Sequence, residues 1–192
     1  VALAAPARVG GDNLRAALRR SIEAGDRATA LQLNAALFTF WITGSALSEA
    51  RGWIEATLAL PRGPETPELV AAEAKVLNVA GYVLAGLAEH ERAAAAFERG
   101  LGLYRAIDNT WGVAWSIRGR AFVHMLRGEH GAARELLSES LRLCRARGDS
   151  WGLAWSLYAL AFLWLAEGDQ ARARVGVARV VVQHGIGHRA AV

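Results

Sequence analysis

The sequence has one cysteine and four prolines in 192 residues, and both scarcities limit the structures that it can form. A single cysteine, Cys144, cannot form a disulfide within the chain, so a disulfide-stapled fold is excluded and a reducing, cytoplasmic setting fits best. No run of 18 apolar residues is free of charges, so the sequence predicts no membrane-spanning helix. Three of the prolines lie in one stretch, PRGPETP at 61–67, which leaves the rest of the chain open to long helices.

Lysine is almost absent as well, because Lys75 is the only one beside 21 arginines. With 18 acidic residues the net charge is +4, and charges of both signs alternate along the predicted helices. Such alternation is typical of a solvated face and not of a nucleic-acid-binding stripe, so direct nucleic-acid binding is not expected. Arginine in place of lysine, with abundant alanine and glycine, fits the coding bias of a GC-rich bacterial genome.

The motifs of several catalytic classes are missing. There is no GxxxxGK[ST] for nucleotide phosphates and no GxSxG for a serine nucleophile, and Ser116 and Ser156 have no His-Asp partner nearby in the sequence. His184 and His188 have the spacing of metal ligands on a helix but are separated by two glycines, with no carboxylate or cysteine beside them. The sequence therefore predicts no catalytic residue, no cofactor and no metal site.

One segment is present twice. WGVAWSIRGRAF, at 111–122, returns forty residues later as WGLAWSLYALAF, at 151–162. Recurrence at a fixed period indicates a supersecondary unit copied in tandem, because such a unit buries its apolar face only by stacking on a neighbour. Each period holds two stretches of helical spacing joined by short turns, and turns of this length make sequential helices antiparallel.

Helical spacing extends over nearly the whole chain, and β-branched clusters are absent before the last twenty residues. We expect an all-α fold in a single domain, 1–192, and a fragment of a longer chain, since the start VALAAPARVGGDN has no methionine. An extra helix at 12–24, capped by Asp12, precedes hairpins at about 27–60, 68–106, 110–147 and 150–183. The expected later helices are 68–86, 91–106, 110–126, 131–147, 150–166 and 169–183.

Small residues recur where two helices of a hairpin would cross, as at Gly81, Ala121 and Ala161, and let the helix axes approach closely. Together with the segments AAAAF and AARELL, this pattern resembles the tetratricopeptide repeat (TPR), stretched from its usual 34 residues to forty. The resemblance implies antiparallel helical hairpins stacked as a TPR-like right-handed superhelix.

A second resemblance is more specific. DNLRAALRRSIEAGDRATALQLNAALFTFWITGSALSEARGWIEATLALP is similar to the segment that follows the ATPase module in large bacterial transcriptional regulators of the LuxR and AfsR types, and the likeness covers about 11–174. It implies a non-catalytic sensor or protein-interaction segment of a cytoplasmic regulator, with the ATPase and the helix-turn-helix outside these residues. The end, RVGVARVVVQHGIGHRAAV, departs from the pattern, so the last helix is either a divergent cap or frayed.

The resemblance to TPR proteins also implies a binding surface, because the first helix of each hairpin lines the concave side of such a superhelix. The stripes that would face it carry aromatic rings and two cations, and such a groove suits a peptide, an extended helix or a sugar-like effector. The candidate residues are Lys75, Asn78, Tyr82, Trp115, Arg118, Phe122, Met125, Trp155, Tyr158 and Phe162. In the alternative interpretation these aromatics only pack between adjacent repeats, as we expect of Trp111 and Trp151.

Two functional readings stay open at this stage. The first is the binding segment of a bacterial transcriptional regulator, and the second is a free-standing scaffold or adaptor with no ATPase or DNA-binding domain. Exposed ends of a short repeat array tend to associate, so a homodimer is expected in either case.

Overall fold

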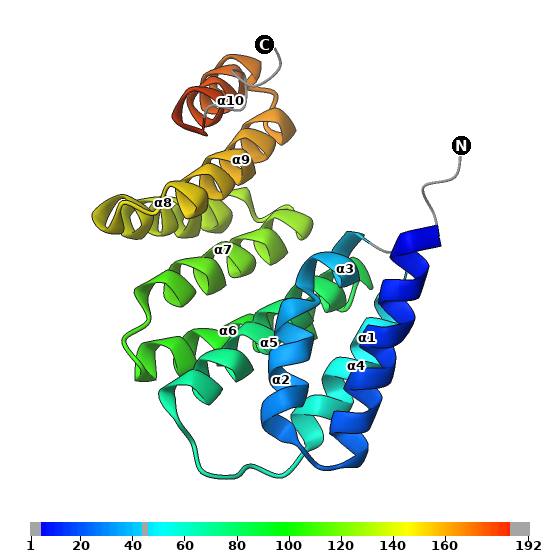
Figure 1. Ribbon diagram of the computed structural model, residues 1–192. Coiled ribbons are helices and arrows are strands. Elements are labelled where there is room, and N and C mark those ends of the chain that lie inside the picture. The colour runs from blue at the N-terminus through cyan, green and yellow to red at the C-terminus, as the bar shows by residue number, and fades with distance from the viewer. Residues whose placement is uncertain (1–4, 44–45, 185–192) are drawn as a thin grey trace, which may run out of the picture. The chain divides into compact units, whose positions relative to one another are not determined.

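The computed structural model describes residues 5–43 and 46–184, and these residues form helices joined by short turns, with no strand among them. Packing gathers the chain into two compact units that divide between Ala96 and Phe97, within α6, and each unit is described by itself. The helices are α1 (Ala5–Glu23), α2 (Arg27–Ala36), α3 (Phe38–Thr43), α4 (Leu47–Ala59), α5 (Pro67–Gly86), α6 (His90–Ala106), α7 (Thr110–Leu126), α8 (His130–Arg147), α9 (Ser150–Ala166) and α10 (Gln170–His184) (Figure 1).

The later helices lie where the sequence predicted them. α7 and α9 begin and end at the predicted residues, and α10 continues through the valine-rich segment to His184. The rest of that segment, including His188, lies outside the described residues.

The first helix was predicted wrongly at its start. α1 begins at Ala5 and not at Asp12, so Asp12 does not cap it and instead pairs with Arg15 one turn later, at 3.3 Å. Pro6 lies in the first turn of α1, where its missing N–H costs no hydrogen bond, and so it does not prevent the helix from starting early.

The first half of the predicted hairpin at 27–60 is divided at Leu37 into α2 and α3. The backbone N–H of Leu37 still donates to Leu33 at 3.0 Å, and that of Trp41 donates to the Leu37 carbonyl at 2.9 Å. Helical hydrogen bonding therefore runs across the division.

The turns repeat with the same period as the sequence. The side chains of Asn109 and Asp149, forty residues apart, each accept a hydrogen bond at 2.9 Å from the backbone N–H three residues on and so cap α7 and α9. Ala88, Gly128 and Gly168, also forty apart, all have left-handed backbone angles, with φ of 61°, 73° and 79°. The period thus repeats backbone geometry as well as residue type.

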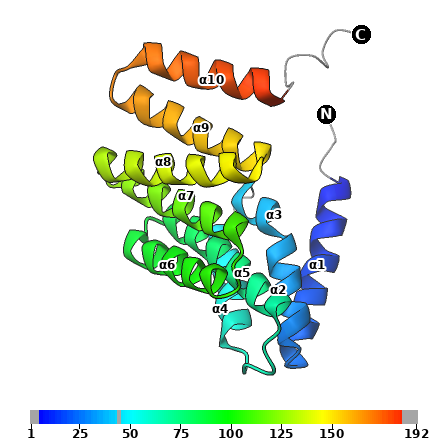
Figure 2. The same cartoon turned by 90° about the vertical axis from the view of Figure 1, so that its left-hand side faces the viewer.

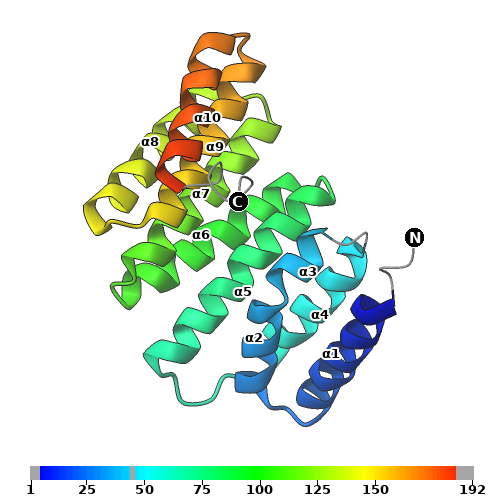
Figure 3. The same cartoon turned by 45° about the horizontal axis from the view of Figure 1, so that its top comes forward.

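In the first unit, α5 packs against both α2 and α4, and α1 packs against α2 (Figure 3). Leu18, Leu31, Trp41 and Leu77 are fully or almost fully buried there and form part of its core. α5 is by length and composition apolar enough to cross a membrane, but 61% of the apolar window is buried within the protein, as in the core helix of a soluble protein.

In the second unit, α7, α8, α9 and α10 pack in chain order, each helix against the one before it (Figure 2). α7 and α9 are the first, or leading, helices of their hairpins and are also in contact with each other. Ala121, Ala133, Ala161 and Ala173 are all buried, in agreement with the predicted close crossing of helices. Gly119 approaches the preceding helix so closely that a Cβ atom there would lie 2.2 Å from the ring of Phe97.

Candidate functional site

Four aromatic side chains lie along one exposed stripe of α9 in the second unit. Trp151, Trp155, Tyr158 and Phe162 keep 46–49% of their surface exposed, and we call these four the aromatic row. Their spacing, i, i+4, i+7 and i+11, places them on one side of a helix. The other side of α9 contributes buried residues such as Leu157 and Leu163 to the core, so these four rings of an apolar helix are left about half exposed.

Neighbouring rings of the aromatic row are in contact with one another. The ring centroids lie 5.8 Å apart for Trp151 and Trp155, 5.7 Å for Trp155 and Tyr158, and 4.8 Å for Tyr158 and Phe162. The pairs Trp155–Tyr158 and Tyr158–Phe162 meet edge to face, an arrangement that aromatic pairs favour, and the rings of Trp151 and Trp155 are tilted by 59°. Such contacts restrict the rotamers of the rings, which lowers the entropy cost of binding.

A buried cation adjoins one end of the row. Arg118 of α7 is 7% exposed, and its guanidinium carbon lies 5.7 Å from the centre of the Trp151 ring. Among the described residues it makes no ion pair and no hydrogen bond, so the face of an aromatic ring is its observed contact. The carboxylate of Asp149 is engaged elsewhere, in capping α9 through the Gly152 N–H.

The charges of Asp149 and Arg118 also act on the thiol of Cys144. Burial raises the pKa of Cys144, the negative charge of Asp149 raises it further, and the positive charge of Arg118 opposes both. The buried hydroxyls of Ser140 and Ser156 lie 3.0 Å apart close by, and Ser140 also donates to the Ala114 carbonyl at 3.1 Å. These groups join α7, α8 and α9 beneath the row and offer no reactive nucleophile.

The predicted groove residues of the second unit differ in how exposed they are. Trp155, Tyr158 and Phe162 share one exposed face, and Arg118 lies at its edge. Phe122 and Met125 are half-buried, and Met125 packs against the core of the unit. Trp115 is 4% exposed, so it presents little surface for a ligand.

The structure also corrects the expectation for Trp151, which was predicted to pack against the preceding hairpin. It is 49% exposed and belongs to the row, because it lies one turn before Trp155 on the same stripe. The four-residue spacing of the two tryptophans was the signal that could have found it.

In the first unit, the predicted residues Lys75, Asn78 and Tyr82 do not form a comparable row. Asn78 is fully buried, whereas Lys75 and Tyr82 are half-buried. Tyr82 contacts the ring of Phe38 from α3, with centroids 5.7 Å apart. This contact could not be predicted from the sequence, because the two residues come from different predicted hairpins.

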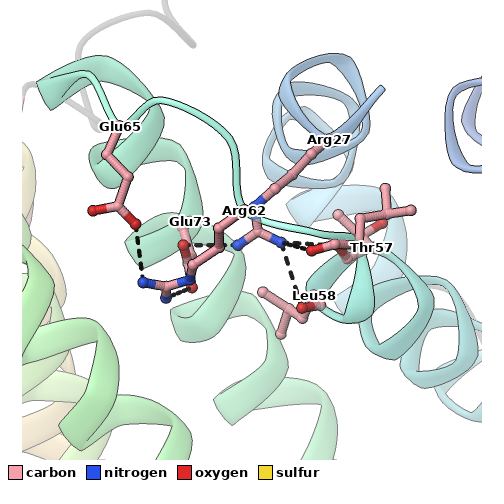
Figure 4. Close-up of polar contacts among 7 residues, drawn as sticks. Arg27, Thr57, Leu58, Arg62, Glu65 and Glu73 are labelled. Carbon is pink, nitrogen blue, oxygen red and sulfur yellow. Dashed lines mark hydrogen bonds and ion pairs between the residues drawn. The ribbon is translucent and has the colours of Figure 1, made fainter. Parts of the chain in front are cut away.

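A second candidate site is a pocket of about 260 Å³ in the first unit, between the start of α2, the loop at 61–66 and α5. Its charged side chains meet at Glu73, whose side chain is only 7% exposed (Figure 4). Arg27 approaches one carboxylate oxygen of Glu73 at 2.8 Å, and Arg62 approaches the other at 2.6 Å while also pairing with Glu65 at 2.9 Å.

These contacts point to a structural role for the pocket. Arg27 also donates to the carbonyl oxygens of Thr57, Leu58 and Leu60, at 3.0–3.4 Å, and so satisfies the end of α4. The hydrogen bond to Glu73 raises the pKa of the Arg62 guanidinium, which keeps it charged. Two cations and two carboxylates thus satisfy one another, and the group fastens the proline loop to α5.

A metal centre has no support in the part of the chain that the structure describes, since no three His, Cys, Asp or Glu side chains gather there. The aromatic row with Arg118 is consequently the arrangement best suited to binding, and its chemistry is that of stacking, apolar contact and one cation.

Comparison with known proteins identifies the fold. No protein-family model matches the chain, and no curated protein sequence does. Among solved structures, the chain is similar to BtubC (BKLC) from P. vanneervenii, with a TM-score of 0.69 and 15% identity over 94% of this chain and 76% of that one. It is also similar to MamA, with a TM-score of 0.60 and 15% identity over 96% of both chains. At this identity the likeness shows the fold alone, and the chain has the TPR-like helical-repeat fold expected from its sequence.

Proposed function

We propose that this chain is the non-catalytic, protein- or peptide-binding segment of a cytoplasmic bacterial transcriptional regulator, and that the aromatic row on α9 is its binding surface. The observation that carries the proposal is that the four rings of the aromatic row, in contact with one another, lie exposed along one side of α9. The alternative, that these aromatics only pack between repeats, accounts for Trp115 but leaves the four exposed rings without a purpose.

The size of the row suits a short partner segment. A fully buried aromatic side chain removes about 150–250 Å² from water, so four rings that are each about half exposed offer roughly 300–500 Å². A patch of this size is as large as the largest apolar patch of a typical monomer and is often functional. It is smaller than the roughly 800 Å² that each partner buries in a standard protein–protein interface, so a peptide-sized segment or a small effector fits it better than a whole domain face.

A thermal-shift screen of peptides and small effectors against the intact chain tests this site. Hits that bind the row should lose their shift in the Tyr158→Ala variant and keep it in Tyr82→Ala, which removes the same side chain from the first unit. Tyr158 is 47% exposed, so its removal should leave the unliganded melting temperature almost unchanged. Hits that survive Tyr158→Ala would place the binding surface elsewhere.

The regulator context rests on the resemblance of residues 12–61 and is tested by the complete open reading frame. A P-loop module upstream or a helix-turn-helix downstream supports the regulator. A frame that encodes neither supports the free-standing scaffold instead.

Sedimentation at several concentrations tests the expected homodimer, which a constant monomer mass would contradict.

A further inference from the structure

The cation beside the aromatic row indicates what the partner must carry. This step rests on the proposed function: we propose that the occupant of the row is a helical segment of a partner protein with an acidic side chain at the end that meets Arg118. The carboxylate would pair with the guanidinium while apolar side chains of the segment cover the four rings.

The state of Arg118 supports an acidic partner. Arg118 is 7% exposed as a whole residue, so it has lost much of its contact with water, and a charge removed from water is costly unless it is paired. The described residues supply it with a ring face at 5.7 Å but no carboxylate. The planar fork of arginine matches the oxygens of a carboxylate, so a single Asp or Glu that reaches the exposed edge of Arg118 would pair with it.

The geometry of the row supports a helical partner. Eleven residues separate Trp151 from Phe162, which corresponds to about 16 Å along α9. A partner helix laid along α9 would present apolar side chains at i, i+3 or i+4, and i+7 over the same length. Because Arg118 lies beside Trp151, at the start of the row, the acidic residue belongs at that end of the partner segment.

A sugar-like effector fits the same surface less well. Sugar rings stack on flat aromatic faces, whereas neighbouring rings of the row are inclined by 59–82° and offer no common plane. Separate, inclined rings suit the interdigitation of protein side chains better.

Peptide selection on the intact chain tests the proposal. A phage-displayed library of random 16-residue peptides is selected on the full chain, and the best binder is synthesised together with a version in which each Asp or Glu becomes Asn or Gln. Affinities for both peptides are measured by fluorescence anisotropy against the unmodified chain, Arg118→Gln, Arg142→Gln and Tyr158→Ala. Arg142 is an exposed arginine of α8 in the same unit and serves as the matched control.

The expected result is a selected peptide with an acidic residue beside apolar ones. Its affinity should fall at least about tenfold when its carboxylate is removed, and by a similar factor when Arg118 becomes Gln. When both are changed, the loss in binding free energy should be much smaller than the sum of the two separate losses, because both substitutions remove the same contact. Arg142→Gln should leave the affinity unchanged. The test on the peptide side does not depend on how well Arg118→Gln folds.

Each other outcome has a definite meaning. If selected peptides lose binding in Tyr158→Ala but are indifferent to their own carboxylates, the acidic-partner inference is overturned while the proposed binding surface stands. If only neutral saccharides bind at the row, the inference is likewise overturned. If no selected peptide or effector depends on Tyr158, the proposed function fails with it.

Discussion

The left-handed turn residues offer a prediction whose control is built into the repeat. Ala88 has φ of 61°, and the residue forty positions later, Gly128, has φ of 73°. A residue with a Cβ atom loses about 1–2 kcal/mol in this conformation, whereas glycine loses about 0.5–1 kcal/mol through its extra freedom in the unfolded chain. Replacing Ala88 by glycine should therefore stabilise the protein by about 0.5–1 kcal/mol.

The reverse change should do the opposite. Gly128→Ala introduces the Cβ atom at a site where no other atom lies within 4 Å, so the effect comes from the backbone alone. We expect a loss of about 0.5–1 kcal/mol, similar in size to the gain from Ala88→Gly.

Urea unfolding followed by circular dichroism at 222 nm measures both changes, because every helix contributes to that signal. The midpoint should rise for Ala88→Gly and fall for Gly128→Ala, with the slope of the transition unchanged. Should Ala88→Gly lower the midpoint, or Gly128→Ala leave it in place, the equivalence of the two turns would be refuted, and with it the argument that the forty-residue period repeats backbone geometry.

Further predictions concern buried contacts and acid sensitivity. Glu73→Gln leaves two guanidinium groups without their buried carboxylate and should cost about 3–5 kcal/mol of unfolding free energy in a denaturant titration. Gly119→Ala should lower stability by about 1–3 kcal/mol through overpacking. Gly102→Ala, in a helix with no atom near the new Cβ, should raise it by about 0.5–1 kcal/mol, and equal melting temperatures would count against both assignments. The hydrogen bond from Arg15 lowers the pKa of Glu49, so this pair contributes stability above the ordinary value of 4.5 that is lost as the pH falls through the lowered pKa. The Arg15→Met variant should therefore lose less stability than the unmodified chain in melts below pH 4.5.

The sequence was sufficient for the fold because the fold is built from local signals. Proline, glycine and capping residues mark each turn, and helical spacing fills the intervals, so α7 and α9 could be predicted to the residue. The start of the first helix was predicted wrongly because Asp12, a residue type that often caps helices, is also tolerated within a helix when an oppositely charged residue such as Arg15 is one turn away.

The site could be predicted only in part, because helical periodicity shows which residues share a stripe but not which stripe a neighbouring helix covers. Trp115 and Trp155 stand at equivalent repeat positions, yet the first is 4% exposed and the second 46%. The pairing of Arg27 with Glu73 escaped prediction for a related reason, since these residues are 46 positions apart and meet only through the packing of α2 on α5.

The inaccessibility of Cys144 has a practical consequence. Cys144 is 2% exposed and the pKa of its thiol is raised, so thiol reagents at neutral pH should leave it unmodified in the folded protein. A single cysteine introduced at an exposed surface position would then be the preferred attachment point for a dye or spin label. The chain thus accepts a site-specific spectroscopic reporter without first being made cysteine-free.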